Sequence, residues 1–411
     1  MIAGLTLNLG LLAYFKYVNF FIDNLNAVLG SLWPPASVVL PIGISFYSFT
    51  QIAFLVDTYQ GKVQEAKFIH YGLFVTYFPH LIAGPVLHHS QMMPQFAAAK
   101  VYLPRSTNLV AGSFIFCLGL FKKVILADGI GPYADAVFRA ADLGDAISTT
   151  EAWIGAVAYA LQLYFDFSGY SDMAVGISWM FNVRLPFNFD APYRAVSISD
   201  FWRRWHISLS TFLRDYLYVV LGGNRKGEFR RYVNLATTML LGGLWHGASW
   251  SFVIWGGLHG LYLLVNHGFR ALLGANAMAR LDRSKVWTIL SWAVTMVCVV
   301  CAWVFFRSQT LSGAAVMLQA MGGAQAPLHE WHVLWNAGLP VSTGAGWCAV
   351  LGVLAVLGPN SNRIGEWLLE SVDRWGRAKL AAATFGLSSA LFLVLINTSR
   401  DSVSAFIYFN F

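Results

Sequence analysis

The stretch YVNLATTMLLGGLWHGASWSFVIWGGLHGLYLLVNHGF, from Tyr232 to Phe269, contains no Asp, Glu, Lys or Arg. A helix that crosses a bilayer needs about 20 apolar residues, so this run is too long for one simple crossing. Its glycines allow bends and close helix contacts. The stretch therefore indicates either a tight helical hairpin or a re-entrant segment.

The rest of the chain has the same character. Of its 411 residues, 57% are hydrophobic and only 11% are charged, against about 25% charged in soluble domains. We therefore predict an all-α integral membrane protein whose single domain, residues 1–411, is a polytopic helical bundle. The candidate spans are the charge-free runs Leu5–Phe15, Val38–Val56, Tyr71–Leu87, Leu109–Phe121, Trp153–Phe165, Thr237–Val265, Trp287–Phe306, Gly344–Leu357 and Leu380–Ile396.

The first and fourth of these runs are short. Lys16 follows one, and Lys122 and Lys123 follow the other. Lysines at such positions can extend toward the membrane surface while their stems stay in apolar surroundings. We expect that arrangement here.

Basic residues in short loops predict the orientation. Residues 184–231, the basic segment, are rich in arginine and should face the cytoplasm, as should residues 270–285 and 363–379. Residues 308–343 carry one charge, Glu330, and should lie outside with the tail after Ser399. This topology accounts for the net charge of +7, and no nucleic-acid partner is implied.

Polar residues gather in the stretch Tyr77–Phe96, which three prolines interrupt. It is either a loop at the membrane surface or non-helical backbone that lines a wet cavity. The stretch contains His80, His88 and His89. Adjacent histidines can bind metals, but no further ligand has a helpful spacing, so we predict no metal site.

Two carboxylates, Asp166 and Asp172, lie in an apolar helical pattern. Inside a bundle they must be paired, hydrated or neutral. Alternatively, the helix ends at the cytoplasmic surface and Asp172 offsets a nearby arginine.

The stretch Ser197–Lys226 predicts one amphipathic helix. Ser199 and Asp200 resemble an N-cap and first turn, apolar residues then recur at helical spacing, and Gly222-Gly223 would end the helix. Tryptophans and arginines suit the membrane interface. His206 falls on the apolar side, where it is either a structural histidine or a functional one.

His246 is the other histidine of interest. Burial disfavours the charged imidazolium, so the ring should stay neutral. A neutral imidazole is a competent general base, and such a group contributes typically about 10²–10⁴-fold in rate. Glycines on both sides would let a substrate approach the backbone closely.

These motifs form a recognisable set. The segments LYFDFSGYSDMAVG, NFDAPYRAVSISDFWRRWHISLSTFLRDYLYVVLGGNRKG and GGLWHGASWSFVIWGGLHG resemble the membrane-bound O-acyltransferase (MBOAT) family, and are most like its branch of bacterial alginate O-acetyltransferase membrane subunits. NLGLLAYFKYVNFF and the terminal FIYFNF agree with that branch. Family members carry roughly a pair of spans ahead of NLGLLAYFKYVNFF, so we expect this chain to lack them.

The resemblance implies a ring of tilted helices around a funnel, in a multi-pass protein of the bacterial cytoplasmic (inner) membrane. It implies that His246 is catalytic and that His206 is the second important histidine. It further implies transfer of an acetyl group, with acetyl-CoA as donor and no bound cofactor, toward a secreted polysaccharide such as alginate. Relatives work with an extracytoplasmic partner protein that completes the transfer.

The candidate substrate-binding residues follow from this expectation. Guanidinium groups pair well with phosphate, so the diphosphate of the donor would meet Arg203, Arg204, Arg225 and Lys226. His206 or an indole N–H, from Trp205 or Trp245, would stabilise the oxyanion or orient His246. Asp200 and Asn188 are the remaining candidate substrate-binding residues.

Three alternatives remain. The acceptor could be teichoic acid, lipid or protein in place of a polysaccharide. The protein could be a transporter, although transporters often contain internal repeats and none is detected here. It could also be a scaffold without activity.

Overall fold

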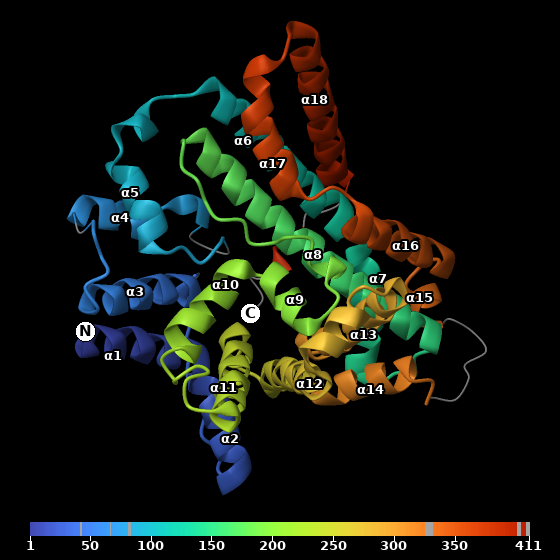
Figure 1. The fold of residues 1–411 in the computed structure, drawn as a ribbon. Coiled ribbons are helices and arrows are strands. Elements are labelled where there is room, and N and C mark those ends of the chain that lie inside the picture. Colours follow the sequence, from blue (N-terminus) through green and yellow to red (C-terminus); the bar gives the residue numbers. More distant parts are fainter. Residues whose placement is uncertain (42, 66, 81–83, 325–331, 401–403, 408–411) are drawn as a thin grey trace.

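The computed structural model describes residues 1–411 except 42, 66, 81–83, 325–331, 401–403 and 408–411 (Figure 1). All regular elements in the described ranges are helical. The α-helices are α1 Ile2–Leu12, α2 Val18–Leu29, α3 Ile44–Tyr59, α4 Phe68–Thr76, α5 His89–Ala97, α6 Ser106–Phe121, α7 Asp128–Leu143, α8 Thr149–Met180, α9 Ile198–Arg204, α10 Ile207–Leu213, α11 Glu228–His246, α12 Trp250–Leu281, α13 Lys285–Arg307, α14 Leu311–Met321, α15 His332–Asn336, α16 Val341–Leu357, α17 Ser361–Ser371 and α18 Arg377–Arg400.

Several of these helices can cross a membrane. Four are long and apolar enough, namely 2–29, 106–143, 285–307 and 377–399, and a bent pair of α16 with 361–374 would make a fifth. Short π-helical segments join α1 to α2 and α6 to α7, so each pair forms one long rod. The predicted all-α, multi-span membrane protein is confirmed.

The centre of the bundle is α8, which runs diagonally through the middle of Figure 1 and packs against α6, α7, α13, α14 and α16. Ser148 and Glu151 form a capping box at its start, which satisfies backbone N–H groups that a helix end leaves open. Its glycines bring α6 very close, because Gly169 faces Gly119 and Gly176 faces Gly112. Almost all of the helix is buried.

Lysines from the α6–α7 rod neutralise the carboxylates of α8. Lys122 binds Asp172 at 2.7 Å, and Lys123 binds Asp166 at 2.8 Å and Asp128 at 2.6 Å. The predicted extension of these lysines to the membrane surface is wrong, because an unpaired carboxylate inside the bundle would cost more than burying the ammonium beside it. Asp172 is paired with a lysine, so the alternative of an arginine partner is also wrong.

The segment Tyr71–Leu87 is not a helical span. Helix α4 ends at Thr76, a 3₁₀ turn follows at Phe78–His80, and the described residues from Gly84 to Leu87 are not helical. Pro79 and Pro85 lack the N–H that a continuing helix would need. The backbone here is supported from outside, as when the N–H of Val86 donates to the hydroxyl of Ser208 at 2.8 Å.

The charge-free stretch forms two packed helices joined by a turn, an arrangement that a tight hairpin and a re-entrant segment share. Helix α11 ends at His246, residues 247–249 turn, and α12 returns along α11. The two helices touch through Gly243 and Gly256, where a Cβ added to Gly256 would meet the carbonyl oxygen of Met239 and the Cα of Gly243, the latter at 3.0 Å.

We therefore expect Gly256→Ala to lower the melting temperature of the protein in detergent. The added methyl would push two backbones apart, and forced overpacking of this kind costs about 1–3 kcal/mol. Gly268→Ala is the matched control, because Gly268 lies on the same helix and a Cβ added to it would meet nothing within 4 Å. Alanine is the better helix former there, so equal losses in the two variants would contradict the close contact.

Candidate active site

His246 is the last residue of α11 and its side chain is buried, with 4% of the residue exposed. Aromatic rings surround it. The ring centroids of Trp245, Trp255 and Phe306 lie 4.9, 5.0 and 5.2 Å from its own, all in edge-on contact. Helices α11, α12 and α13 thus each supply one wall.

The turn after His246 depends on Gly247. A Cβ at this position would overlap the ring of Phe252, which folds back over the turn. Phe252 in turn packs on Phe306 with a centroid separation of 5.0 Å. The glycine therefore lets an aromatic side chain close the space beside the histidine.

The N-terminal rod holds the end of α11. Lys16 donates to the carbonyl oxygens of Trp245 and His246 at 2.5 and 3.2 Å, and Tyr17 donates to that of Leu244 at 2.9 Å. The last carbonyls of a helix have no partner within the helix, so these bonds satisfy them. Lys16 was expected at the membrane surface, and that expectation is wrong because these carbonyls, together with the hydroxyl of Ser45, give the ammonium acceptors inside the bundle.

His206 lies at a break in the predicted amphipathic helix. The prediction of one helix from Ser199 to Gly222 is wrong, because α9 ends at Arg204 and α10 begins at Ile207. His206 adopts the left-handed backbone region with φ of 44°, which is uncommon for a residue with a side chain and typical of functional or over-determined positions. The N-cap is Ser197, whose hydroxyl accepts from the N–H of Asp200.

A hydrogen-bonded chain fixes the ring of His206. Its Nδ1 lies 3.2 Å from Oδ1 of Asn188, which also accepts from the N–H and hydroxyl of Ser208 at 3.1 and 2.9 Å. Because the amide oxygen can only accept, Nδ1 is the protonated nitrogen in this arrangement. The ring of His206 contacts Trp245 at 6.4 Å, so both histidines lie against the same indole.

A third histidine, His259, completes the group. It is fully buried on α12, its Nδ1 accepts from the indole N–H of Trp202 at 3.2 Å, and its ring contacts Trp255 at 4.8 Å. No role was predicted for His259, although its position in the same charge-free stretch was the available signal.

Two buried donors near His246 have no acceptor among the described residues. These are the indole N–H groups of Trp245 and Trp255, whose rings both contact His246. Buried polar groups are nearly always hydrogen-bonded, so an unsatisfied pair requires an explanation. A polar atom of a bound substrate is one that fits the location.

A pocket of about 440 Å³ opens beneath this centre, between α10, α11 and α12; we call it the α11 pocket. Its inner wall includes Trp202, whose ring lies 5.8 Å from Trp255, and Met239. Met239 is seven residues before His246, about 10 Å along the helix axis. The other lining residues are Ser210, Leu213, Arg214, Tyr218, Asn224, Arg231, Leu235, Thr238, Leu263 and His267.

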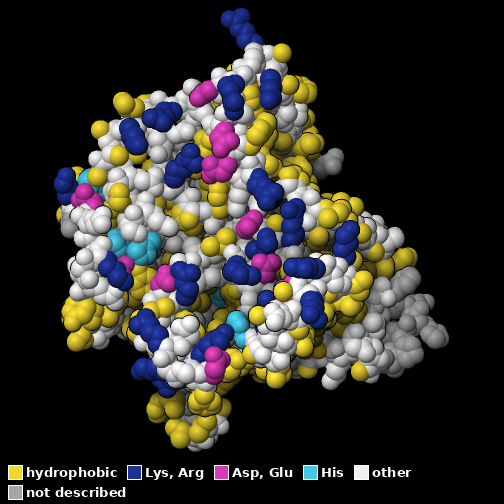
Figure 2. Space-filling model, viewed as in Figure 1, with side chains coloured by type: hydrophobic (Ala, Val, Ile, Leu, Met, Phe, Trp, Pro, Cys, Tyr) yellow, Lys and Arg dark blue, Asp and Glu magenta, His cyan; other side chains and the backbone are white. Residues whose placement is uncertain are grey.

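The polar end of the α11 pocket is basic. Arg214 and Arg231 line it, and Figure 2 shows Lys and Arg side chains spread over this face of the molecule while hydrophobic side chains gather along its lower and right-hand margins. His267 lies outside the candidate spans, and burial together with the charges of Arg231 and Arg270 lowers its pKa. The positive charge of the pocket therefore comes from the two arginines.

The predicted substrate-binding residues fall into three groups. Trp245 and Asn188 belong to the histidine centre, while Trp205 is buried beside it in an aromatic stack with Phe201 and Phe189. Asp200, Arg203 and Arg204 form ion pairs, and the first two line a separate pocket of about 320 Å³. Arg225 and Lys226 are exposed in the loop before α11, and neither lines the α11 pocket.

These features define a multi-span helical membrane protein whose polar centre is a set of three buried histidines. The sequence profile of the membrane-bound O-acyltransferase family matches residues 10–308. The chain belongs to this family.

The relatives of this chain carry related names. A peptidoglycan O-acetyltransferase of Helicobacter pylori is 44% identical over 348 residues, which are 79% of this chain and 64% of the relative. A probable alginate O-acetylase of Pseudomonas putida is 46% identical over 326 residues, 78% of this chain and 64% of the relative. A teichoic acid D-alanyltransferase of Bacillus subtilis is 26% identical over 238 residues, 56% of this chain and 60% of the relative. The chain thus spans about three fifths of the length of these curated relatives.

Proposed function

We propose that the protein is an O-acetyltransferase of the bacterial inner membrane that moves an acetyl group from acetyl-CoA toward the hydroxyl group of an extracytoplasmic glycan. The observation that carries this proposal is the surroundings of His246, a buried imidazole in contact with two indole rings whose N–H groups lack acceptors among the described residues. Family membership and the names of the relatives support O-acyl transfer and a glycan acceptor.

The reaction uses these groups in a defined order. His246 accepts the proton of the acceptor hydroxyl while the hydroxyl oxygen attacks the thioester carbonyl carbon. Trp245 and Trp255 donate to the oxyanion that develops on the carbonyl oxygen. The carbon–sulfur bond then breaks, and the thiolate of CoA leaves with the proton that His246 holds.

The supporting residues keep this geometry in place. Asn188 orients His206, and Lys16 holds the end of α11, so that neither ring depends on a flexible loop for its position. The aromatic walls exclude water, which would otherwise hydrolyse the thioester. An extracytoplasmic partner protein would complete transfer to the polymer, as the resemblance implies.

The α11 pocket supplies the donor site in this proposal. Arg214 and Arg231 would bind the diphosphate, since guanidinium groups pair well with phosphate. The pantetheine arm would pass Met239 and Trp202 toward His246. The basic residues of this face agree with a cytoplasmic orientation under the positive-inside rule.

Two measurements test the function. Purified protein in lipid vesicles should release CoA thiol from acetyl-CoA when acceptor and partner are present, and deletion of the gene should remove acetyl esters from one cell-envelope glycan. Peptidoglycan and alginate are the first glycans to analyse. Unchanged acetyl content in all glycans, with no thiol release, would reject the enzyme and leave the transporter and the scaffold.

The donor site gives a separate prediction. Arg231→Gln should raise KM for acetyl-CoA by about 10-fold or more with little change in kcat, because a hydrogen bond to a charged group contributes about 1.5–3 kcal/mol. Arg374→Gln, on an exposed turn that does not line the α11 pocket, is the control. If Arg225→Gln raises KM and Arg231→Gln does not, the diphosphate binds the exposed loop.

A further inference from the structure

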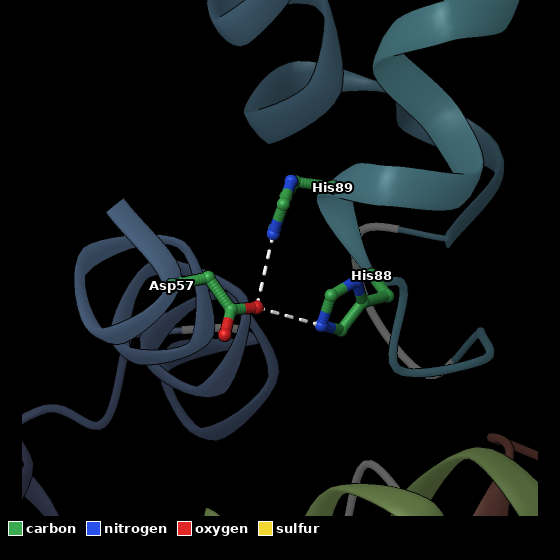
Figure 3. A group of neighbouring side chains, drawn as sticks. All are labelled: Asp57, His88 and His89. Atoms are coloured by element: carbon green, nitrogen blue, oxygen red, sulfur yellow. Dashed lines mark hydrogen bonds and ion pairs between the residues drawn. The ribbon is translucent and has the colours of Figure 1, made fainter. Parts of the chain in front are cut away.

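A second polar cluster lies away from the histidine centre. Asp57 near the end of α3, His88 just before α5 and His89 at the start of α5 converge on one point (Figure 3). Nε2 of His88 and Nε2 of His89 lie 2.9 and 3.0 Å from the same carboxylate oxygen, Oδ2 of Asp57. Asp57 and His89 are buried, with 2% and 3% of each residue exposed.

The cluster stands alone in the part of the chain that the structure describes. Its three ligand atoms lie within 4.8 Å of one another, and no other group of three His, Cys, Asp or Glu side chains in that part meets this condition. The two histidines are adjacent in sequence and Asp57 is distant from them, so the packing of α3 against α5 brings the carboxylate to the histidines.

Four polar groups crowd together at this point. Oδ2 of Asp57 faces both imidazoles and also the hydroxyl of Tyr216, while the other oxygen, Oδ1, has Lys62 at 3.7 Å. The hydroxyl of Tyr216 also contacts Nε2 of His88. Two imidazole nitrogens and a carboxylate oxygen that converge in this way are a ligand set that zinc accepts.

A divalent cation resolves the crowding. We propose that Asp57, His88 and His89 bind Zn²⁺, with the Tyr216 hydroxyl or a water in the fourth position. Zinc takes imidazole nitrogens and carboxylate oxygens at about 2.0–2.2 Å in a tetrahedron, which places neighbouring ligand atoms about 3.3 Å apart. The separations of 2.9 and 3.0 Å between Oδ2 of Asp57 and the two Nε2 atoms reach that value after a shift of a few tenths of an ångström, whereas the hydroxyl of Tyr216 would have to move farther to become the fourth ligand.

The surroundings suit such a site. Ser90 holds the ring of His88 from its far side, because its hydroxyl lies 2.6 Å from Nδ1 and its backbone N–H donates to Nδ1 at 3.3 Å. Such outer contacts orient a ligating histidine. A pocket of about 290 Å³, lined by His88, Asp215 and Tyr216, gives an entry path. The two imidazoles and one carboxylate, with no thiolate, match a borderline cation in preference to Ca²⁺ or Mg²⁺, which prefer oxygen ligands.

Bound zinc would join three parts of the chain. Asp57 belongs to α3, the histidines to α5, and Tyr216 to the π-helical segment after α10. The same pocket is lined by Ser208, which also binds Asn188 next to His206. The proposal does not rest on the acetyltransferase function, because zinc binding can be measured without substrate.

The experiment uses the full chain, purified in detergent without a histidine tag and stripped with EDTA. After addition of Zn²⁺ and dialysis, elemental analysis should find about one zinc per chain, and competition with a chromogenic chelator gives the affinity. His89→Gln and Asp57→Asn should weaken binding by more than about 100-fold, since loss of a mere outer-shell partner costs 10–100-fold. His80→Gln is the matched control, a buried histidine from the same stretch that lies outside the cluster.

A second readout covers variants that fold poorly. Zinc should raise the melting temperature of the unmodified chain and of His80→Gln, and EDTA should reverse the rise, because a ligand that binds only the folded state stabilises it. Co²⁺ in place of Zn²⁺ should give the visible absorption of a tetrahedral nitrogen–oxygen site. The proposal is overturned if the unmodified chain takes up no stoichiometric zinc, or if His89→Gln and Asp57→Asn bind it as well as His80→Gln does.

Discussion

His246→Ala should reduce the rate of acetyl transfer by about 10²–10⁴-fold, the range that a general base contributes. The variant removes the imidazole that accepts the proton. The backbone carbonyl of residue 246 can still accept from Lys16, so the C-terminal end of α11 should stay in place. The measurement is the initial rate of CoA thiol release together with the amount of folded protein in the membrane. The melting temperature should change far less than the rate.

A variant of a histidine outside the site serves as the control for His246→Ala. His332→Ala is the control, because His332 opens the short helix α15 and lies outside the aromatic enclosure of His246. It should keep the full rate. His246→Gln should be as inactive as the alanine variant, since an amide is not a base at neutral pH. Acetylated glycan at the normal level in either His246 variant would exclude this residue as the base.

Lys123→Met should cost about 3–5 kcal/mol in the free energy of unfolding, the range for breaking a buried ion pair. Only 1% of Lys123 is exposed, and its ammonium lies between Asp166 and Asp128. Methionine has a similar length but no charge, so the carboxylate of Asp166 would be left inside the bundle without a cation. Denaturation in mixed micelles would measure the loss.

Two further variants isolate the charge. Lys123→Met combined with Asp166→Asn removes the buried ammonium and the more deeply buried of its two carboxylates. It should recover much of the stability, because the remaining carboxylate, Asp128, has 15% of its side chain exposed. Arg184→Gln breaks the pair with Glu366, in which about half of each side chain is exposed, and should cost about 0–1 kcal/mol. Equal losses for Lys123→Met and Arg184→Gln would show that the buried pair contributes no more than a surface one.

Local patterns predicted what depends on local forces. The apolar, charge-poor composition required a helical membrane bundle, and the apolar helical pattern around Asp166 and Asp172 placed both carboxylates in a helix. The uncharged stretch around His246 predicted a hairpin or a re-entrant segment with a buried histidine. Each of these follows from the apolar character or spacing of neighbouring residues.

Local patterns failed where distant residues intervened. Periodicity predicted one helix through His206, but Asn188 and the aromatic stack of Trp205 hold the chain in a break there. Lysines after short apolar runs were expected at the surface, but α8 and α11 offered them carboxylates and carbonyls within the bundle. The residues predicted to bind the donor, Arg203, Arg204, Arg225 and Lys226, do not line the α11 pocket, and their role stays a prediction.

The amino-acid sequence by itself thus determined the class of fold, the helical setting of Asp166 and Asp172 and the burial of His246. Composition and spacing suffice for these, because they show which residues would be costly to expose to water or to bury as charges. Only the tertiary structure decided which groups meet. It placed Lys16 on the end of α11, paired Lys123 with Asp166, and brought Asp57 to His88 and His89. Such pairings join residues that are far apart in the chain. They stabilise the protein only when the fold brings the two side chains into contact, and a local sequence pattern does not show which distant residues will meet.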